Sequence, residues 1–187
     1  MENERNRVCP VELANSLDNK IRRWVQNPRK ILAPYIKEGM TALDIGCGPG
    51  FFSIELAKLV GEAGKVIAAD LQQGMLQKLH EKVKGTELEG RIKPVKCEKD
   101  NINVSESVDF ILTFYMVHEV PDKNAFFKQL HKVLNDNGQY LLVEPKLFHV
   151  SLKDFQSTLT LARDNGFDIY PAPRLFVSWS AILKKRA

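Results

Sequence analysis

The chain has 187 residues, of which 44% are hydrophobic and 27% are charged. This length and balance are typical of one folded domain with a real core, and they exclude long disordered tracts. Lys and Arg outnumber Asp and Glu by 27 to 23. This small excess is not interleaved with aromatic residues, so it does not indicate a nucleic-acid partner.

The cysteines and the chain start limit the cellular setting. Cys9, Cys47 and Cys97 have no paired spacing, so the sequence indicates neither a disulfide framework nor a metal site. The first residues are polar, and no apolar run reaches the roughly 18 residues that a membrane span needs. We therefore expect no membrane partner and a reduced, cytoplasmic location.

Residues 11–36 have apolar side chains at three- and four-residue spacings, with prolines at positions 28 and 34. This pattern predicts an amphipathic helix, a turn near residues 26–28 and a short second helix that extends to Ile36. Both helices precede the first apolar strand-like run. We expect them to form an arm that lies across the rest of the fold.

From residue 41 onward, short apolar runs alternate with segments of helical periodicity. We predict strands over 41–45, 65–69, 92–96, 108–113, 138–144, 167–170 and 176–183. We predict helices over 51–60, 74–84, 124–133 and 151–165. Strict alternation of strands and helices implies a parallel sheet covered on both faces, and right-handed crossovers make it doubly wound.

The end of the chain departs from this alternation. Only the loop 171–174 joins the last two predicted strands, and it is too short for a helical crossover. The expected fold is therefore α/β, a doubly wound, mostly parallel seven-stranded sheet with an antiparallel final strand. We expect a single domain over residues 1–187, with 1–37 as an N-terminal helical arm or lid and 38–187 as the core.

Three glycines, Gly46, Gly48 and Gly50, lie between the first predicted core strand and the helix that follows. Glycine lets a ligand approach the backbone and lets a turn adopt φ values that other residues resist. A nucleotide-binding loop explains this spacing better than a turn kept only for packing. A dinucleotide site would have the pattern G-x-G-x-x-G, but its last position here is Phe51.

Two acidic residues at strand ends help to identify the nucleotide. Asp44 stands just before the glycines, where a carboxylate would repel pyrophosphate but attract the ammonium and sulfonium charges of S-adenosylmethionine. Asp70 ends the second core strand, where a carboxylate accepts from both ribose hydroxyls in either cofactor class. Capping of the following helix is the alternative role for Asp70. The charge of Asp44 favours the sulfonium cofactor.

Four segments resemble, in order and spacing, the class I S-adenosylmethionine-dependent methyltransferases. These segments are Leu43–Gly50, Ala68–Leu71, Val108–Val120 and Gly138–Pro145. Within this family the chain is similar to the small-molecule "type 11" group. The resemblance implies a Rossmann-like methyltransferase fold, S-adenosylmethionine as methyl donor, S-adenosylhomocysteine as product and a small-molecule methyl acceptor.

The resemblance also implies which residues bind the cofactor. The positions that match the family's methionine and ribose contacts are Asp44, Gly46, Cys47, Gly48, Gly50 and Asp70, with Leu71 beside the adenine or ribose. Glu98 and the N–H of Lys99 would contact the adenine, although Cys97-Glu98-Lys99 replaces the family's common Gly-Asp-Ala and Asp100 is an alternative. The backbone of Thr113 and Phe114 would pass the methionine moiety.

The stretch after the fourth strand bears on the methyl acceptor. Its sequence Thr-Phe-Tyr-Met lacks the Asn/Asp-Pro-Pro-Tyr/Phe pattern of enzymes that methylate nucleobase amino groups. His118 follows, near the carboxyl end of the strand, and is a candidate general base; a structural or orienting role is the alternative. Tyr115 is a second candidate for contact with the acceptor.

Other functions stay open at this point. A protein or RNA methyltransferase, or a module that binds S-adenosylmethionine without catalysis, would share these motifs. A nicotinamide-dependent oxidoreductase would use the same sheet and Asp70, but Asp44 and Phe51 oppose it.

Overall fold

The computed structural model describes residues 26–146, 150–173, 175 and 177–186. The first predicted helix of the arm, and Cys9, lie outside these residues. The second predicted helix is present as α3 (Pro28–Leu32), where the side chain of Asn27 accepts a hydrogen bond from the Lys30 N–H at 3.1 Å. The prediction that it extends to Ile36 is wrong, because Pro34 has no N–H to continue the helical hydrogen bonds.

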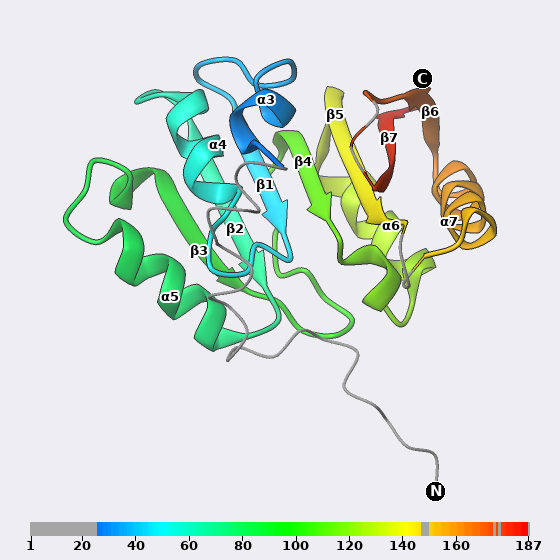
Figure 1. The fold of residues 1–187 in the computed structure, drawn as a ribbon, viewed down its shortest axis with the longest axis horizontal. Helices are drawn as coiled ribbons and strands as arrows, with labels where there is room; N and C mark the ends of the chain where they lie inside the picture. The colour runs from blue at the N-terminus through cyan, green and yellow to red at the C-terminus, as the bar shows by residue number, and fades with distance from the viewer. Residues whose placement is uncertain (1–25, 147–149, 174, 176, 187) are drawn as a thin grey trace, which may run out of the picture.

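One mixed sheet forms the centre of the molecule (Figure 1). In the described part of the chain its seven strands lie in the order β3-β2-β1-β4-β5-β7-β6. Their bounds are β1 Thr41–Ile45, β2 Lys65–Asp70, β3 Ile92–Lys96, β4 Val108–Phe114, β5 Leu134–Pro145, β6 Phe167–Pro171 and β7 Ser178–Lys185. The first five strands pair in parallel, whereas β7 runs antiparallel to both β5 and β6. The predicted fold class and the antiparallel final strand are confirmed.

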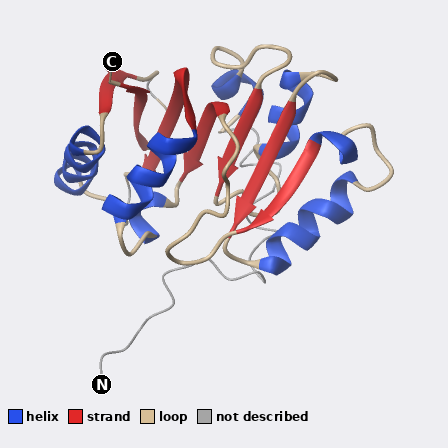
Figure 2. Ribbon diagram, turned by 180° about the vertical axis from the view of Figure 1, so that it is seen from behind, coloured by secondary structure: helices blue, strands red, loops and turns tan. Residues whose placement is uncertain are grey.

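Helices cover both faces of the sheet, as the view from behind shows (Figure 2). They are α4 Ser53–Val60, α5 Gln73–Val83, α6 Lys123–Val133 and α7 Leu152–Asp164, with 3-10 turns η2 Glu89–Arg91 and η3 Val117–Glu119. Side chains of α3, α4 and α5 belong to the hydrophobic cluster on one face, and those of α6 and α7 to the cluster on the other. Strands buried on both faces explain the continuous apolar runs of the sequence.

The strand order reverses direction at the centre of the sheet, between β1 and β4. The first three strands progress outward from β1 to β3, after which the chain returns to lay β4 on the other side of β1. The helix after β1 therefore packs on one face of the sheet and the helix after β4 on the other, and ligands of open α/β sheets bind at such a switch point. In Figure 1 the arrowheads of β1, β2 and β4 meet at the same edge, so residues that follow these strands are brought together.

Several predicted boundaries differ from the structure, and two of these differences have a local structural reason. The helix after the glycine loop begins at Ser53, because residues 48–52 are turns. The predicted turn at residues 135–138 belongs to β5, but as an irregularity: the register moves from Val108↔Leu134 to Phe110↔Gln139. Extra residues on β5 therefore bulge out between two paired regions, which explains the turn-like sequence Asn-Asp-Asn-Gly.

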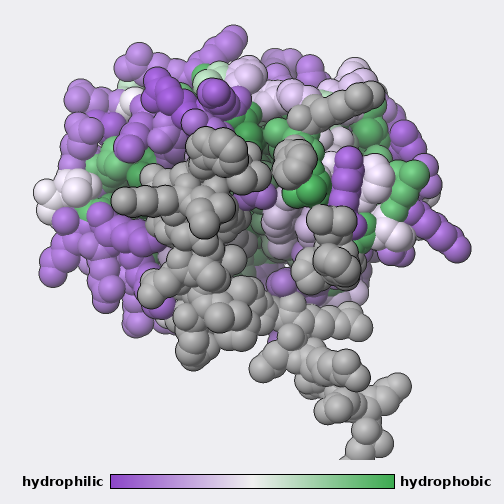
Figure 3. All heavy atoms as spheres, in the orientation of Figure 1, coloured by the Kyte–Doolittle hydropathy of each residue, from purple (hydrophilic) through white to green (hydrophobic). Residues whose placement is uncertain are grey.

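The described residues on the face shown in Figure 3 are largely polar. Figure 3 shows hydrophilic side chains over the α4 and α5 end of this face, with hydrophobic atoms confined to small areas. Among the described residues the large hydrophobic side chains that are well exposed are Leu152, at 49%, and Tyr170. None of the described helices has the length and apolar character that a membrane crossing requires.

Core packing predicts a contrast between two apolar truncations. Phe127 is fully buried on α6, and its ring contacts the rings of Tyr140 and Phe167. We expect Phe127→Ala to lower the free energy of unfolding by about 3–5 kcal/mol, because it leaves a cavity. The exposed Leu152 serves as control, and we expect Leu152→Ala to change the free energy of unfolding by less than about 0.5 kcal/mol. Urea unfolding of both variants measures the difference; equal losses would contradict this placement of the core.

Candidate active site

The glycine loop follows β1 and is anchored on β2. Gly46 and Cys47 both donate their N–H groups to the carbonyl of Ala69, at 2.8 and 3.2 Å. Gly50 has a φ of +88°, which favours glycine, and a Cβ there would also meet Cδ1 of Leu79 on α5, which would have to shift. Gly48, with a φ of +54°, has no described atom within 4 Å of such a Cβ. The backbone at Gly48 therefore has room for a ligand, and the backbone at Gly46 is exposed as well.

Asp44 holds the start of α4. Its side chain is only 2% exposed, and Oδ2 accepts a hydrogen bond from the hydroxyl of Ser53 at 2.6 Å. The neighbouring Cys47 thiol is buried, and burial, followed by the charges of Asp44 and Asp70, raises its pKa well above the usual range. A thiol with a raised pKa is a poor nucleophile at neutral pH, and a contact of Cys47 with the cofactor stays a prediction.

Asp70 links the glycine loop to the following helix. Its Oδ2 accepts from the Gly48 N–H and its Oδ1 from the Gln72 N–H, both at 2.8 Å. Gln72 is the N-cap residue of α5, so Asp70 fixes the segment that leads into this helix without being its N-cap residue. Each carboxylate oxygen has a second lone pair, so ribose hydroxyls can still bind. Burial raises the pKa of Asp70, whereas these backbone N–H groups lower it.

The residues predicted to contact adenine lie beside Asp70. The Cys97 N–H donates to the backbone carbonyl of Asp70 at 2.9 Å, and the thiol is buried, which raises its pKa to about 12. Glu98 and Lys99 have exposed side chains, and Glu98 forms an ion pair with Lys96 at 3.7 Å. Leu71 is half-buried at the end of β2. Their contacts with the adenine stay predictions.

Side chains at the end of β4 pack inward. The Thr113 hydroxyl is buried and hydrogen-bonded to the Tyr140 hydroxyl at 2.8 Å. Phe114 packs between the rings of Phe52 and Tyr115, at centroid distances of 4.4 and 4.5 Å. Thr113 and Phe114 would therefore contact a ligand through their backbone, as the resemblance implies.

Tyr115 turns the chain at the end of β4. Its φ of +63° is rare for a residue other than glycine and is often found at functional sites. The Tyr115 hydroxyl is 2.5 Å from Oγ of Ser178 and accepts from the Gln26 amide at 2.9 Å. These bonds fix Tyr115 between β7 and the residues before α3, so the structure favours a positioning role over proton transfer.

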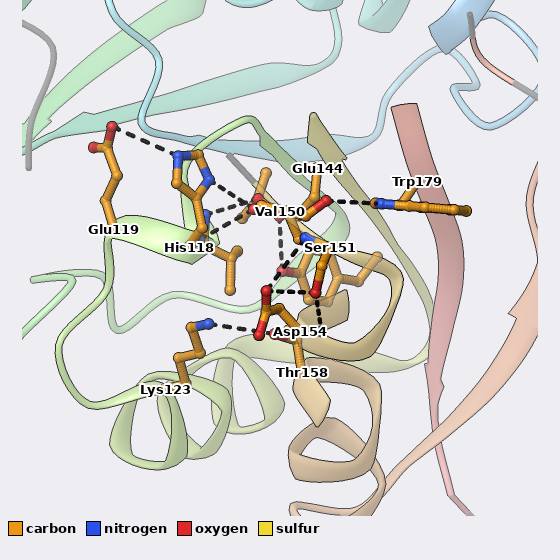
Figure 4. Close-up of polar contacts among 12 residues, drawn as sticks. His118, Glu119, Lys123, Glu144, Val150, Ser151, Asp154, Thr158 and Trp179 are labelled. Atoms are coloured by element: carbon orange, nitrogen blue, oxygen red, sulfur yellow. Dashed lines mark hydrogen bonds and ion pairs between the residues drawn. The ribbon is translucent and has the colours of Figure 1, made fainter. Parts of the chain in front are cut away.

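His118 lies in η3 and is held by Glu144 at the end of β5 (Figure 4). Nδ1 of His118 is 2.7 Å from Oε2 of Glu144. The Val117 and His118 N–H groups donate to Oε1 and Oε2 of the same carboxylate, at 3.0 and 3.2 Å. Glu144 is only 2% exposed. One buried carboxylate thus fixes both the turn and the ring.

Glu119 is on the other side of the ring. Its Oε1 is 4.0 Å from Nε2 of His118, and its side chain is 24% exposed. Burial raises the pKa of Glu119 to about 7; His118 lowers it, and the charges of Glu144 and Asp70 raise it. An acid with a pKa near neutrality can both hold and release a proton under working conditions.

The structure brings these groups to one edge of the sheet. The end of β1 pairs with the end of β4 through Ile45↔Thr113, and a Cβ on Gly46 would lie 2.9 Å from Cγ of Met116. The glycine loop and the turn that carries His118 are therefore in contact. Sequence reasoning missed Glu144 and Glu119. Glu144 had a usable signal, because it ends a buried apolar strand as Asp44 and Asp70 do.

Comparisons with known proteins agree with this geometry. Ubiquinone/menaquinone biosynthesis C-methyltransferase UbiE of Haemophilus ducreyi is 27% identical over 110 residues, which are 58% of this chain and 42% of that protein. Demethylmenaquinone methyltransferase of Lactobacillus johnsonii is 32% identical over 110 residues, 58% of this chain and 45% of that protein. The chain thus matches less than half the length of these curated relatives.

A solved structure and a family model cover more of the chain. The crystal structure of a SAM-dependent methyltransferase from Aquifex aeolicus has a TM-score of 0.82 and 26% identity, over 94% of this chain and 97% of that one. A family model described as a methyltransferase domain matches residues 36–171. This chain therefore belongs to the methyltransferase-domain family, which confirms its recognition as a class I S-adenosylmethionine-dependent methyltransferase.

Proposed function

We propose that the chain transfers a methyl group from S-adenosylmethionine to a small-molecule acceptor, with His118 as the general base. The observation that carries this proposal is the 2.7 Å bond between His118 and Glu144, in a turn that touches the glycine loop. The names of the curated relatives, a ubiquinone/menaquinone biosynthesis C-methyltransferase and a demethylmenaquinone methyltransferase, support a small organic acceptor.

The residues around the loop fit the cofactor. The open face of Gly48 permits close approach of a ligand, and Asp70 offers acceptor lone pairs beside it. Asp44 and Asp70 add negative charge, which suits a cation and disfavours pyrophosphate. When bound, S-adenosylmethionine supplies an electrophilic methyl group on a positively charged sulfur. The residues that would hold it are those of the glycine loop, Asp70, and the backbone after β3 and β4.

Glu144 sets the chemistry that His118 can perform. An ionised carboxylate only accepts hydrogen bonds, so the bond to Glu144 requires that Nδ1 of His118 carry a proton. The neutral ring then has its basic lone pair on Nε2, and the carboxylate stabilises the imidazolium that forms when Nε2 takes a proton. The arrangement suits an acceptor with a proton to lose at the reacting atom, such as a phenolic hydroxyl or an activated ring carbon.

Binding of the cofactor is tested at Asp70. We expect Asp70→Ala to weaken binding of S-adenosylmethionine. The substitution removes two charge-assisted hydrogen bonds to the ribose hydroxyls, worth about 1.5–3 kcal/mol each. The matched control is Asp109→Ala, since Asp109 accepts from the Thr41 N–H and from Asn135 at the opposite edge of the sheet. Calorimetry should show full affinity for the control. Equal affinity in both variants, or preferential binding of NAD by the unsubstituted chain, would refute the assignment.

Methyl transfer is tested at His118. With labelled S-adenosylmethionine and 1,4-dihydroxynaphthalene, kept reduced, among a panel of small phenols and amines, we expect His118→Asn to lower kcat/KM by about 10²–10⁴-fold. Asparagine keeps a donor for Glu144, so cofactor affinity should persist. His80→Asn, on the exposed side of α5, is the control. Unchanged turnover in His118→Asn would exclude it as the base, and cofactor binding without any label transfer would favour a non-catalytic module.

A further inference from the structure

The imidazole of His118 lies between two carboxylates that differ in their access to solvent (Figure 4). Glu144 contacts Nδ1 and is 2% exposed, whereas Glu119 faces Nε2 and is 24% exposed. The 4.0 Å between Nε2 and Oε1 of Glu119 is longer than a hydrogen bond. A hydrogen bond between the two groups requires the Glu119 side chain to rotate toward Nε2. Glu119 is therefore placed to exchange a proton with the ring on one side and with water on the other.

Methyl transfer has a charge balance that this arrangement matches. A bond forms between the acceptor atom and the methyl carbon, and the carbon–sulfur bond breaks with its electron pair remaining on sulfur. The acceptor's proton goes to Nε2 of His118. The positive charge that enters the site on the sulfonium is thus left as a proton on the ring, and it has to leave before the next turnover.

We propose that Glu119 accepts this proton from Nε2 of His118 and releases it to solvent, so that it acts on the reaction through His118. This inference rests on the proposed function. A nearby cation favours the ionised form of a carboxylate. A sulfonium bound beside this turn would therefore favour the ionised form of Glu119. Once the proton is on His118, its transfer to Glu119 would leave both the ring and the carboxyl group neutral.

Burial and charge at Glu119 support the proposal. Burial raises the pKa of Glu119 to about 7, with Glu144 on β5 and Asp70 on β2 raising it and His118 on the same turn lowering it. A carboxyl group with an ordinary pKa would stay ionised at neutral pH and store no proton. This position near neutrality is what lets the charge on the cofactor sulfur change its protonation.

The test compares binding of S-adenosylmethionine with binding of S-adenosylhomocysteine by calorimetry between pH 5.5 and 8.5. Because only the first ligand carries the sulfonium charge, its affinity relative to the second should rise with pH as Glu119 ionises. If the pKa of Glu119 is one unit lower in the complex with S-adenosylmethionine than in the complex with S-adenosylhomocysteine, the ratio of the two affinities rises about tenfold as Glu119 ionises. This readout needs no methyl acceptor.

Variants separate Glu119 from its neighbours. We expect Glu119→Gln to lose most of the pH dependence of the ratio, and Glu119→Asp to retain part of it. Asp70 and the other ionisable groups of the site are common to the unsubstituted chain and to Glu119→Gln, so the difference between these two proteins isolates Glu119. The pH dependence of the affinity ratio should persist in His118→Asn. Glu55→Gln, at a side chain of 17% exposure on α4, is the matched control and should behave as the unsubstituted chain.

The outcomes distinguish the two proposals. If both ligands bind and Glu119→Gln keeps the full pH dependence, the proton-accepting role of Glu119 is wrong while the proposed function stands. A pH-independent ratio in the unsubstituted chain would lead to the same conclusion. If neither ligand binds the unsubstituted chain, the proposed function itself fails.

Discussion

The carboxylate of Glu144 fixes the part of the structure on which the proposed chemistry depends. A buried carboxylate is costly unless donors satisfy it, and this one is bonded to the Val117 N–H, the His118 N–H and Nδ1 of His118. The turn after β4 is therefore fastened to the end of β5. Without Glu144, the ring would lose both its orientation and the partner that determines which nitrogen is basic. The position of Glu119 follows, because it is the next residue of the same turn.

Buried acids at three strand ends share a dual role. Asp44 on β1 binds the Ser53 hydroxyl at the start of α4, and Asp70 on β2 binds the N–H groups of Gly48 and Gln72. Each acid thus organises the loop that follows its own strand, as Glu144 on β5 organises a turn from β4. The same charges make this edge of the sheet suitable for a cationic ligand. Local structure and the electrostatics of the site therefore come from the same residues.

The fold could be predicted largely from the sequence, whereas the site could be predicted only in part. Continuous apolar runs indicated the strands because both faces of the sheet are buried, and the glycines marked the loop after β1. The His118–Glu144 bond joins residues 26 positions apart, and it depends on the register of β4 against β5, which no local pattern encodes. The inward packing of Thr113 likewise depends on Tyr140, a neighbour supplied by that register. The end of α3 was missed although Pro34 marked it.

A crystal structure of the chain with S-adenosylhomocysteine would test the central claim most directly, because it shows where the sulfur lies relative to His118 and Glu119. We predict that the ribose hydroxyls bind Asp70 and that the amino acid moiety of the ligand passes the glycine loop. We also predict that the sulfur faces the turn at residues 117–119. A nucleoside bound elsewhere, with Asp70 uncontacted or with the sulfur directed away from that turn, would contradict it.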